Sequence, residues 1–148
     1  MTHDCNGLEI LTQDECLLLL EHAHLGRMAL SVAALPVVLP VNYTLMDGDI
    51  VVSTVAGSKM DAALADAVVA FEIDGADPFY HQGWSVLVRG VARVITDPDE
   101  LARAESLHLR PWASPATCHY VRIEADVVTG RRIVRDRASF RSIEELAT

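Results

Sequence analysis

The chain has 148 residues, 51% hydrophobic and 22% charged, which is typical of one globular domain and excludes a disordered or low-complexity chain. Its formal net charge of −9 argues against a nucleic-acid or anionic-membrane partner, because both require a basic face. No run of about 18 apolar residues could span a membrane, and the N-terminus lacks the features of a secretory signal. We therefore expect one cytoplasmic domain over residues 1–148.

The first half of the chain shows one helix followed by three strands. Thr12 and Glu15 have the spacing of a capping box, which predicts a helix that ends near Gly26. Pro40 is compatible with a strand only at an edge or a bulge. Asp47-Gly48 is a strong signal for a hairpin turn. The expected strands cover residues 26–32, 37–45 and 50–54.

The second half begins with a short helix from Lys59 to about Asp66, followed by further strands. A second helix is expected from Asp97-Pro98 to about Leu109. The predicted strands cover residues 68–74, 84–95 and 120–128, and a short one could continue over 131–134. About six strands without regular strand–helix alternation argue against a doubly wound parallel sheet and favour a β-barrel or α+β fold. Residues 1–10 and 136–148 are expected to be loosely ordered tails.

Three cysteines, Cys5, Cys16 and Cys118, form no pair at metal-ligand spacing. An odd number of thiols without such spacing indicates reduced cysteines and not a disulfide framework or a zinc site. His22 and His24 lie two residues apart within the first helical pattern, so they do not share a helix face. No metal site is expected.

The segment that ends in Gly57-Ser58-Lys59 is the most informative for chemistry. A strand ends in two hydroxyl side chains, Ser53 and Thr54, and a glycine-containing loop leads into a helix. Unpaired N–H groups at the start of a helix bind phosphate well, and Lys59 is the only lysine in a strongly acidic chain. The alternative is that Ser58 only caps the helix and Lys59 is a solvated side chain; the residues alone do not decide between the two.

A second candidate is Pro40-Val41-Asn42-Tyr43. An asparagine in an otherwise apolar strand must satisfy its amide, either within the protein or by contact with a polar edge of a ligand. An exposed edge position for Asn42 is the competing interpretation.

Taken in order, these segments resemble the pyridoxamine 5′-phosphate oxidase-like family of flavin-binding split barrels. The resemblance covers roughly Leu11 to Val134. It implies a mainly β fold with flanking helices, a six-stranded split β-barrel, and a homodimer that binds FMN at its interface. The segments that carry it are Gly26–Ala29, Pro40–Tyr43, Ser53–Thr54, Gly57–Lys59, Gly83–Gly90, Pro111–Ala113, Val121–Ile123 and Thr129–Arg132.

The resemblance also implies roles for individual residues. Arg27 would lie near the ribityl phosphate. The phosphate would be held by Ser53, Thr54, Gly57, Ser58 and Lys59. The isoalloxazine ring would be bordered by Pro40, Val41, Asn42 and Tyr43. The other subunit would contribute Trp84, Ser85, Arg89 and Trp112.

One departure separates the chain from true pyridoxamine-phosphate oxidases. The arginines between Val128 and Ser142 do not reproduce the substrate clamp of those enzymes, and a solvated tail or one with salt bridges between subunits is the alternative. The resemblance therefore implies an FMN-dependent oxidoreductase acting on an unidentified small molecule. A non-catalytic protein that carries flavin, the deazaflavin F420 or haem is the alternative, and a cofactor-free interaction protein would leave Lys59 and Asn42 without a role.

Overall fold

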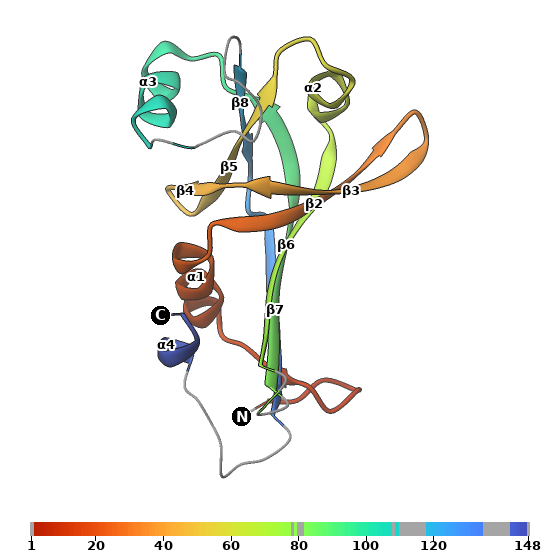
Figure 1. Ribbon diagram of the computed structural model, residues 1–148, viewed down its shortest axis with the longest axis vertical. Coiled ribbons are helices and arrows are strands. Elements are labelled where there is room, and N and C mark those ends of the chain that lie inside the picture. Colours follow the sequence, from red (N-terminus) through yellow and green to blue (C-terminus); the bar gives the residue numbers. More distant parts are fainter. Residues whose placement is uncertain are drawn as a thin grey trace.

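The computed structural model describes one curled antiparallel sheet flanked by helices (Figure 1). It describes residues 2–77, 79, 82–107, 109, 118–134 and 143–147. In chain order the elements are β1 (Glu9–Ile10), α1 (Gln13–His22), β2 (Leu25–Val32), β3 (Leu35–Asn42), β4 (Thr44–Met46), β5 (Asp49–Val55), α2 (Lys59–Leu64), β6 (Val68–Asp77), β7 (Gln82–Val94), α3 (Pro98–Ser106), β8 (Cys118–Ile123), β9 (Val127–Val134) and α4 (Ile143–Leu146).

The sheet order is β3-β2-β6-β7-β8-β5-β4, with β9 paired to both β7 and β1. Because β7 is 13 residues long, its first part pairs with β9 and its last part with β8. The predicted mainly β architecture with flanking helices is confirmed. The described residues form nine strands and not six, because two predicted strands are interrupted and β1 was not predicted.

Local signals in the sequence placed several boundaries correctly. Thr12 and Glu15 form the predicted capping box at the start of α1. Asp47 and Gly48 have φ angles of 53° and 82°, the left-handed conformation that a tight hairpin turn between β4 and β5 requires. Pro40 lies in β3, which is an edge strand, so its missing N–H costs no interior ladder bond.

Two predicted strands are broken in the structure. The strand expected over 37–45 is divided at Tyr43, where the chain leaves β3 for β4. The strand expected over 120–128 ends at Ile123, and the chain turns before β9 begins at Val127. A Cβ atom on Gly90 would overlap the Glu124 carbonyl oxygen, so this turn depends on a glycine beneath it. Neither break changes the apolar pattern, which explains why periodicity did not reveal them.

One face of the sheet builds the core. Met28, Phe71 and Val88 lie opposite one another on β2, β6 and β7 and are at most 1% exposed. Helix α1 packs on the same side across β7 and β9, where it buries Cys16 and Leu19. Burial raises the pKa of the Cys16 thiol to about 11, so this cysteine is an unreactive core side chain.

The opposite face, called the outer face here, is not covered by a helix of the described chain (Figure 1). Its central row runs across five strands through Val38, Ala29, Ala70, Arg89 and Val127, each opposite the next in the ladder. Side chains of directly opposed residues point to the same face. Val38 is 63% exposed and Val127 is 43% exposed, so the row is open to solvent, and it is apolar except for Arg89.

Each of the two expected tails contains a short element. Strand β1 pairs with β9, and the buried Arg132 holds it through two donors to Glu9 at 2.7–2.9 Å. Helix α4 packs against α1 and buries Ile143. Strand β1 lies within the segment 1–10 and helix α4 within 136–148, and the segment 135–142 lies outside the described residues.

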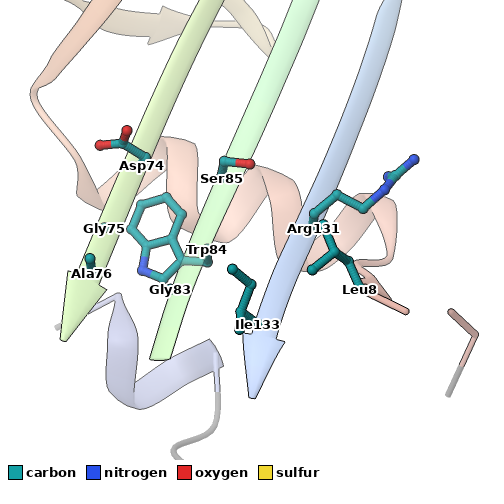
Figure 2. Close-up of a pocket in the computed structure, with 9 residues that line it drawn as sticks. All are labelled: Leu8, Asp74, Gly75, Ala76, Gly83, Trp84, Ser85, Arg131 and Ile133. Carbon is teal, nitrogen blue, oxygen red and sulfur yellow. The ribbon is translucent and has the colours of Figure 1, made fainter. Parts of the chain in front are cut away.

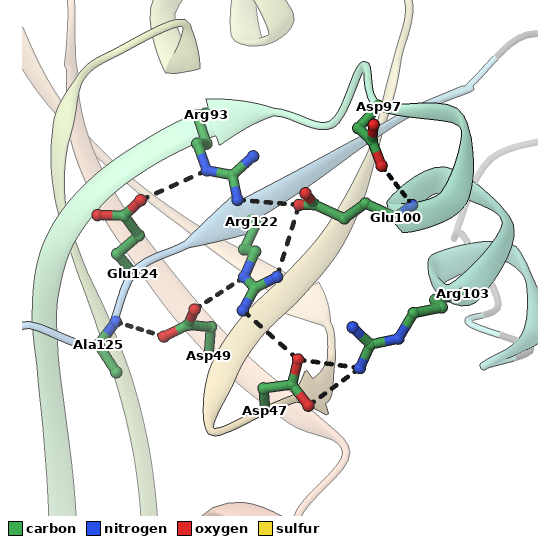
Figure 3. A network of polar contacts seen from close by, with 9 residues as sticks. All are labelled: Asp47, Asp49, Arg93, Asp97, Glu100, Arg103, Arg122, Glu124 and Ala125. Carbon is green, nitrogen blue, oxygen red and sulfur yellow. Dashed lines mark hydrogen bonds and ion pairs between the residues drawn. The ribbon is translucent and has the colours of Figure 1, made fainter.

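A network of charged side chains attaches α3 to the sheet (Figure 3). Arg93 and Arg122 stand directly opposite each other on β7 and β8, an arrangement that is unfavourable for like charges. Glu100 of α3 lies between them, 2.9 Å from Arg93 and 3.6 Å from Arg122. Asp49 accepts from Nε of Arg122 at 2.7 Å and from the backbone N–H of Ala125 at 2.9 Å. The carboxylates therefore neutralise the arginine pair.

Replacing Glu100 by Gln should lower the free energy of unfolding by about 1–3 kcal/mol, since two partly buried guanidinium groups lose a shared anion. Urea denaturation monitored by circular dichroism measures this change. Glu105→Gln, the same change at an exposed position of α3, serves as the control. Equal midpoints for the two variants would show that the network does not stabilise the fold.

Candidate functional site

The predicted phosphate loop lies between β5 and α2. Ser58 caps α2, and its side chain accepts a hydrogen bond of 3.1 Å from the backbone N–H of Asp61. Gly57 has a φ of +75°, so the loop uses the conformation that glycine adopts without strain. The predicted helix start at Lys59 is confirmed, and the capping role of Ser58 applies whether or not a ligand binds.

A carboxylate of α2 that was not among the predicted site residues, Asp61, accepts the hydrogen bonds of this loop. Asp61 is 8% exposed and accepts hydrogen bonds of 3.0 Å from the Thr54 hydroxyl and from the Gly57 N–H. Nδ1 of His119 lies 2.9 Å from both of its oxygens. Two of the expected phosphate donors, Thr54 and Gly57, thus donate to a side chain of the same protein.

The polar contacts keep Asp61 ionised. Burial by itself favours the neutral acid, but the hydrogen bonds from Gly57, His119 and Thr54 outweigh it and lower the pKa of Asp61 below its ordinary value. An ionised carboxylate has only acceptor sites, so Nδ1 of His119 must carry a proton and donate it. The contact thereby assigns the tautomer of His119.

Other predicted residues of this loop keep free polar atoms. Lys59 is exposed, and no acidic side chain in the described part of the chain pairs with it. Ser53 is half-buried on β5, opposite Tyr120 of β8. The side chains here whose donors are not used by the described contacts are therefore the Lys59 ammonium and the Ser58 hydroxyl.

The second predicted segment borders β3. Pro40 is exposed, and Val41 and Asn42 are half-buried. Tyr43 is 3% exposed, its hydroxyl donates to the Leu20 carbonyl at 2.7 Å, and its ring packs edge-on against Phe71. The Tyr43 side chain is therefore part of the core, and only its backbone is left to border a ligand.

Arg27 has partners within the sheet. Its guanidinium lies 3.4 Å from Glu72 and 3.1 Å from Asp74, both on the adjacent strand β6. All three side chains are on the outer face. One arginine facing two carboxylates leaves this part of the face with an excess negative charge.

Two further predicted residues, Trp84 and Ser85, line a pocket of about 300 Å³ at the far end of β6, β7 and β9 (Figure 2). The indole packs on Gly75, where an added Cβ would lie 2.6 Å from the ring nitrogen. This end of the sheet is remote from α2 (Figure 1). Within one chain, the structure does not bring Trp84 and Ser85 together with Lys59.

The pocket includes groups that the sequence analysis did not assign to a site. Arg131 of β9 lies opposite Ser85 and is held by Asp4 at 3.0 Å. Asp74 of β6 and Leu8 also line it. Strand register alone could have suggested Asp74 and Arg131, whereas Leu8 reaches the pocket only because β1 pairs with β9.

The remaining predicted residues are placed as follows. Arg89 is exposed in the centre of the outer face, and no acidic side chain of the described residues pairs with it. Trp112 lies outside the described residues. Arg131 and Arg132 are engaged by Asp4 and Glu9 of the same chain, so these two salt bridges are not the inter-subunit ones of the alternative. No helix in the described ranges is long and apolar enough to cross a membrane.

Comparison with known proteins identifies relatives of the whole domain. The chain is 42% identical over 131 residues to the "Uncharacterized protein Rv0080" of Mycobacterium tuberculosis, covering 85% of this chain and 86% of that protein. It is 37% identical to the solved FAD binding protein from Mycobacterium smegmatis, with a TM-score of 0.74 over 84% of this chain and 99% of that one.

A FAD and heme binding protein from Mycobacterium smegmatis has a TM-score of 0.66 over 92% of this chain and 77% of that one. Its identity of 18% shows a shared fold alone. The family model described as pyridoxamine 5′-phosphate oxidase matches residues 12–132, and this range includes the β5–α2 loop and the pocket residues Trp84, Ser85 and Arg131. The chain belongs to the pyridoxamine 5′-phosphate oxidase family.

Proposed function

We propose that the protein is a flavin-dependent oxidoreductase that binds FMN between two copies of the chain and acts on a small molecule. The observation that carries the proposal is the only lysine of a chain with net charge −9, which lies exposed in the first turn of α2, next to the Ser58 cap. In an acidic protein, such a group is suited to the phosphate of a cofactor.

Two flavin nucleotides are candidates for binding at this loop. The expectation from the sequence is FMN, whose terminal phosphate would contact Ser58 and Lys59. The relative from Mycobacterium smegmatis is described as FAD binding, so FAD is the second candidate for the same loop. The residues present fit a phosphate group, although the Asp61 carboxylate reduces the number of open donors.

A second copy of the chain is the proposed partner of the outer face. Its central row is apolar except for Arg89, which no acidic side chain of the described ranges pairs with, and the two carboxylates of Glu72 and Asp74 face the single guanidinium of Arg27. A two-fold axis between two copies can place the positive charge of one copy against the excess negative charge of the other. Such a dimer would also supply Trp84 and Ser85 to a flavin bound at the other copy, as the resemblance implies.

A bound flavin supplies hydride transfer, so the chain need only bind, orient and shield it. Lys59 and Ser58 would hold the phosphate. The Trp84 indole and Arg131 guanidinium offer a flat surface and a positive charge to a planar, electron-accepting group. A cytoplasmic location fits the three free thiols and is part of the proposal.

The test is the absorbance spectrum of the purified protein, followed by titration with FMN, FAD, F420 and haem. We expect a flavin spectrum, tight binding of a flavin nucleotide, and reduction of the bound flavin by NADH, NADPH or reduced F420. Flavin binding without turnover on quinone, nitroaromatic or other acceptors would favour a carrier. Binding of none of these cofactors would overturn the proposal.

A further inference from the structure

Arg89 places a positive charge in the otherwise apolar central row of the outer face. It lies on β7 between Ala70 of β6 and Val127 of β9, and its side chain is exposed. No acidic side chain in the described part of the chain pairs with it. If a second copy covers this row, the guanidinium leaves water, and a buried charge without a partner strongly destabilises a contact. The proposed dimer therefore requires a carboxylate at Arg89.

Two carboxylates on the same face share a single cation. Glu72 and Asp74 lie two residues apart on β6, so both side chains point to the outer face. The guanidinium of Arg27 lies 3.4 Å from Glu72 and 3.1 Å from Asp74. Burial and the charge of nearby Asp74 raise the pKa of Glu72 above its ordinary value. The negative charge of Glu72 is thus only partly compensated within its own chain.

The register of β6 and β7 places Glu72 diagonally from Arg89. Ala70 lies directly opposite Arg89, and Glu72 lies directly opposite Leu87. Diagonal neighbours on one face of a sheet are about 7–8 Å apart. Asp74 lies two residues further along β6, so Glu72 is the nearer of the two carboxylates to Arg89.

We propose that, in the dimer, Arg89 of each copy pairs with Glu72 of the other copy. In a face-to-face contact the two-fold axis lies in the plane of the interface, and two residues that meet do so twice, once on each side of the axis. An axis that crosses the line between Arg89 and Glu72 at its midpoint forms both ion pairs at once. Ala70 and Leu87 lie close to such an axis and would provide apolar contacts between the two pairs. This inference rests on the proposed function, because it names a contact within the proposed dimer.

An ion pair within one chain is the competing arrangement, since a long side chain can span a diagonal. In the structure, Glu72 contacts Arg27, which lies opposite it on β2, the neighbour of β6 on the side away from β7. Within a single copy, Glu72 is therefore held by Arg27 and Arg89 is left for another partner. The two arrangements differ in one measurable respect: only the contact between copies can be restored by mixing two variants.

The experiment reverses the two charges in separate chains. Arg89→Glu and Glu72→Arg each bring like charges together twice in their own homodimers, so each dimer dissociation constant should rise at least about a hundredfold. In an equimolar mixture, the heterodimer has both contacts matched and should form with an affinity within about tenfold of the wild type. Sedimentation velocity measures the affinities, and native mass spectrometry identifies the heterodimer by its mass.

Two further variants serve as controls. Asp74→Arg reverses a charge on the same strand that also contacts Arg27, and it should form no heterodimer with Arg89→Glu. The double variant Arg89→Glu/Glu72→Arg should dimerise with itself, which shows that chains with both reversals fold. If Glu72→Arg alone does not fold, a double-mutant cycle with Glu72→Gln and Arg89→Gln measures the same coupling, and the two losses of dimer affinity should not add.

The outcomes separate this inference from the proposed function. Recovery in the double variant but not in the mixture would place the pair within one chain and overturn the inference. Single variants that dimerise as tightly as the wild type, additive losses in the cycle, or rescue by Asp74→Arg in place of Glu72→Arg would overturn it as well. A monomeric wild type would overturn the proposed dimer and this inference together. A dimeric wild type that binds no flavin would overturn the proposed function and leave the ion pair in place.

Discussion

Replacing Ala29 by Glu should convert the proposed dimer into a monomer at micromolar concentration. Ala29 lies in the central row of the outer face, opposite Val38 and Ala70, so the proposed two-fold contact would bury one new carboxylate from each copy. Removing a charge from water without a matched partner costs about 3 kcal/mol or more. The dimer dissociation constant should therefore rise more than about a hundredfold.

Sedimentation velocity measures this change, and fluorescence titration measures its effect on the cofactor. FMN affinity should fall together with dimerisation, because Trp84 and Ser85 would reach the ligand only from the other copy. Ala102→Glu, on the exposed side of α3, introduces the same charge and should leave the dimer intact. A monomeric wild type, or a dimeric Ala29→Glu, would show that the outer face is not the dimer interface.

The second large effect is expected at Lys59. Lys59→Ala should weaken FMN binding by about 1.5–3 kcal/mol, the range for a charge-assisted hydrogen bond. Riboflavin should bind both proteins equally, because it has no phosphate to contact the ammonium group. Lys59→Arg keeps the charge and should retain most of the affinity.

Quenching of flavin fluorescence on binding provides the measurement. Equal FMN affinities for wild type and Lys59→Ala would show that Lys59 does not bind the phosphate. Lys59 would then be a solvated side chain in the first turn of α2. A loss of riboflavin affinity in the variant would instead point to a disturbed loop, which thermal unfolding would reveal.

The sequence offered candidate site residues but not the contacts between them. It selected Ser58, Lys59, Trp84 and Ser85 as candidates, and the structure places the first two at one loop and the last two at one pocket. It did not identify Asp61 or His119, which are 58 residues apart and look like a solvated helix residue and an isolated histidine. Only the pairing of β5 with β8 brings them together.

The sequence by itself determined what depends on neighbouring residues. The capping box at Thr12, the turn at Asp47-Gly48 and the start of α2 after Ser58 rest on hydrogen bonds within a few residues, and each is present. The tertiary structure decided what depends on distant segments: the break at Tyr43, whose hydroxyl reaches α1, and the pairing of β1 with β9. Such long-range contacts cannot be read from the hydrophobic periodicity of the sequence, because strand register and packing decide which residues meet.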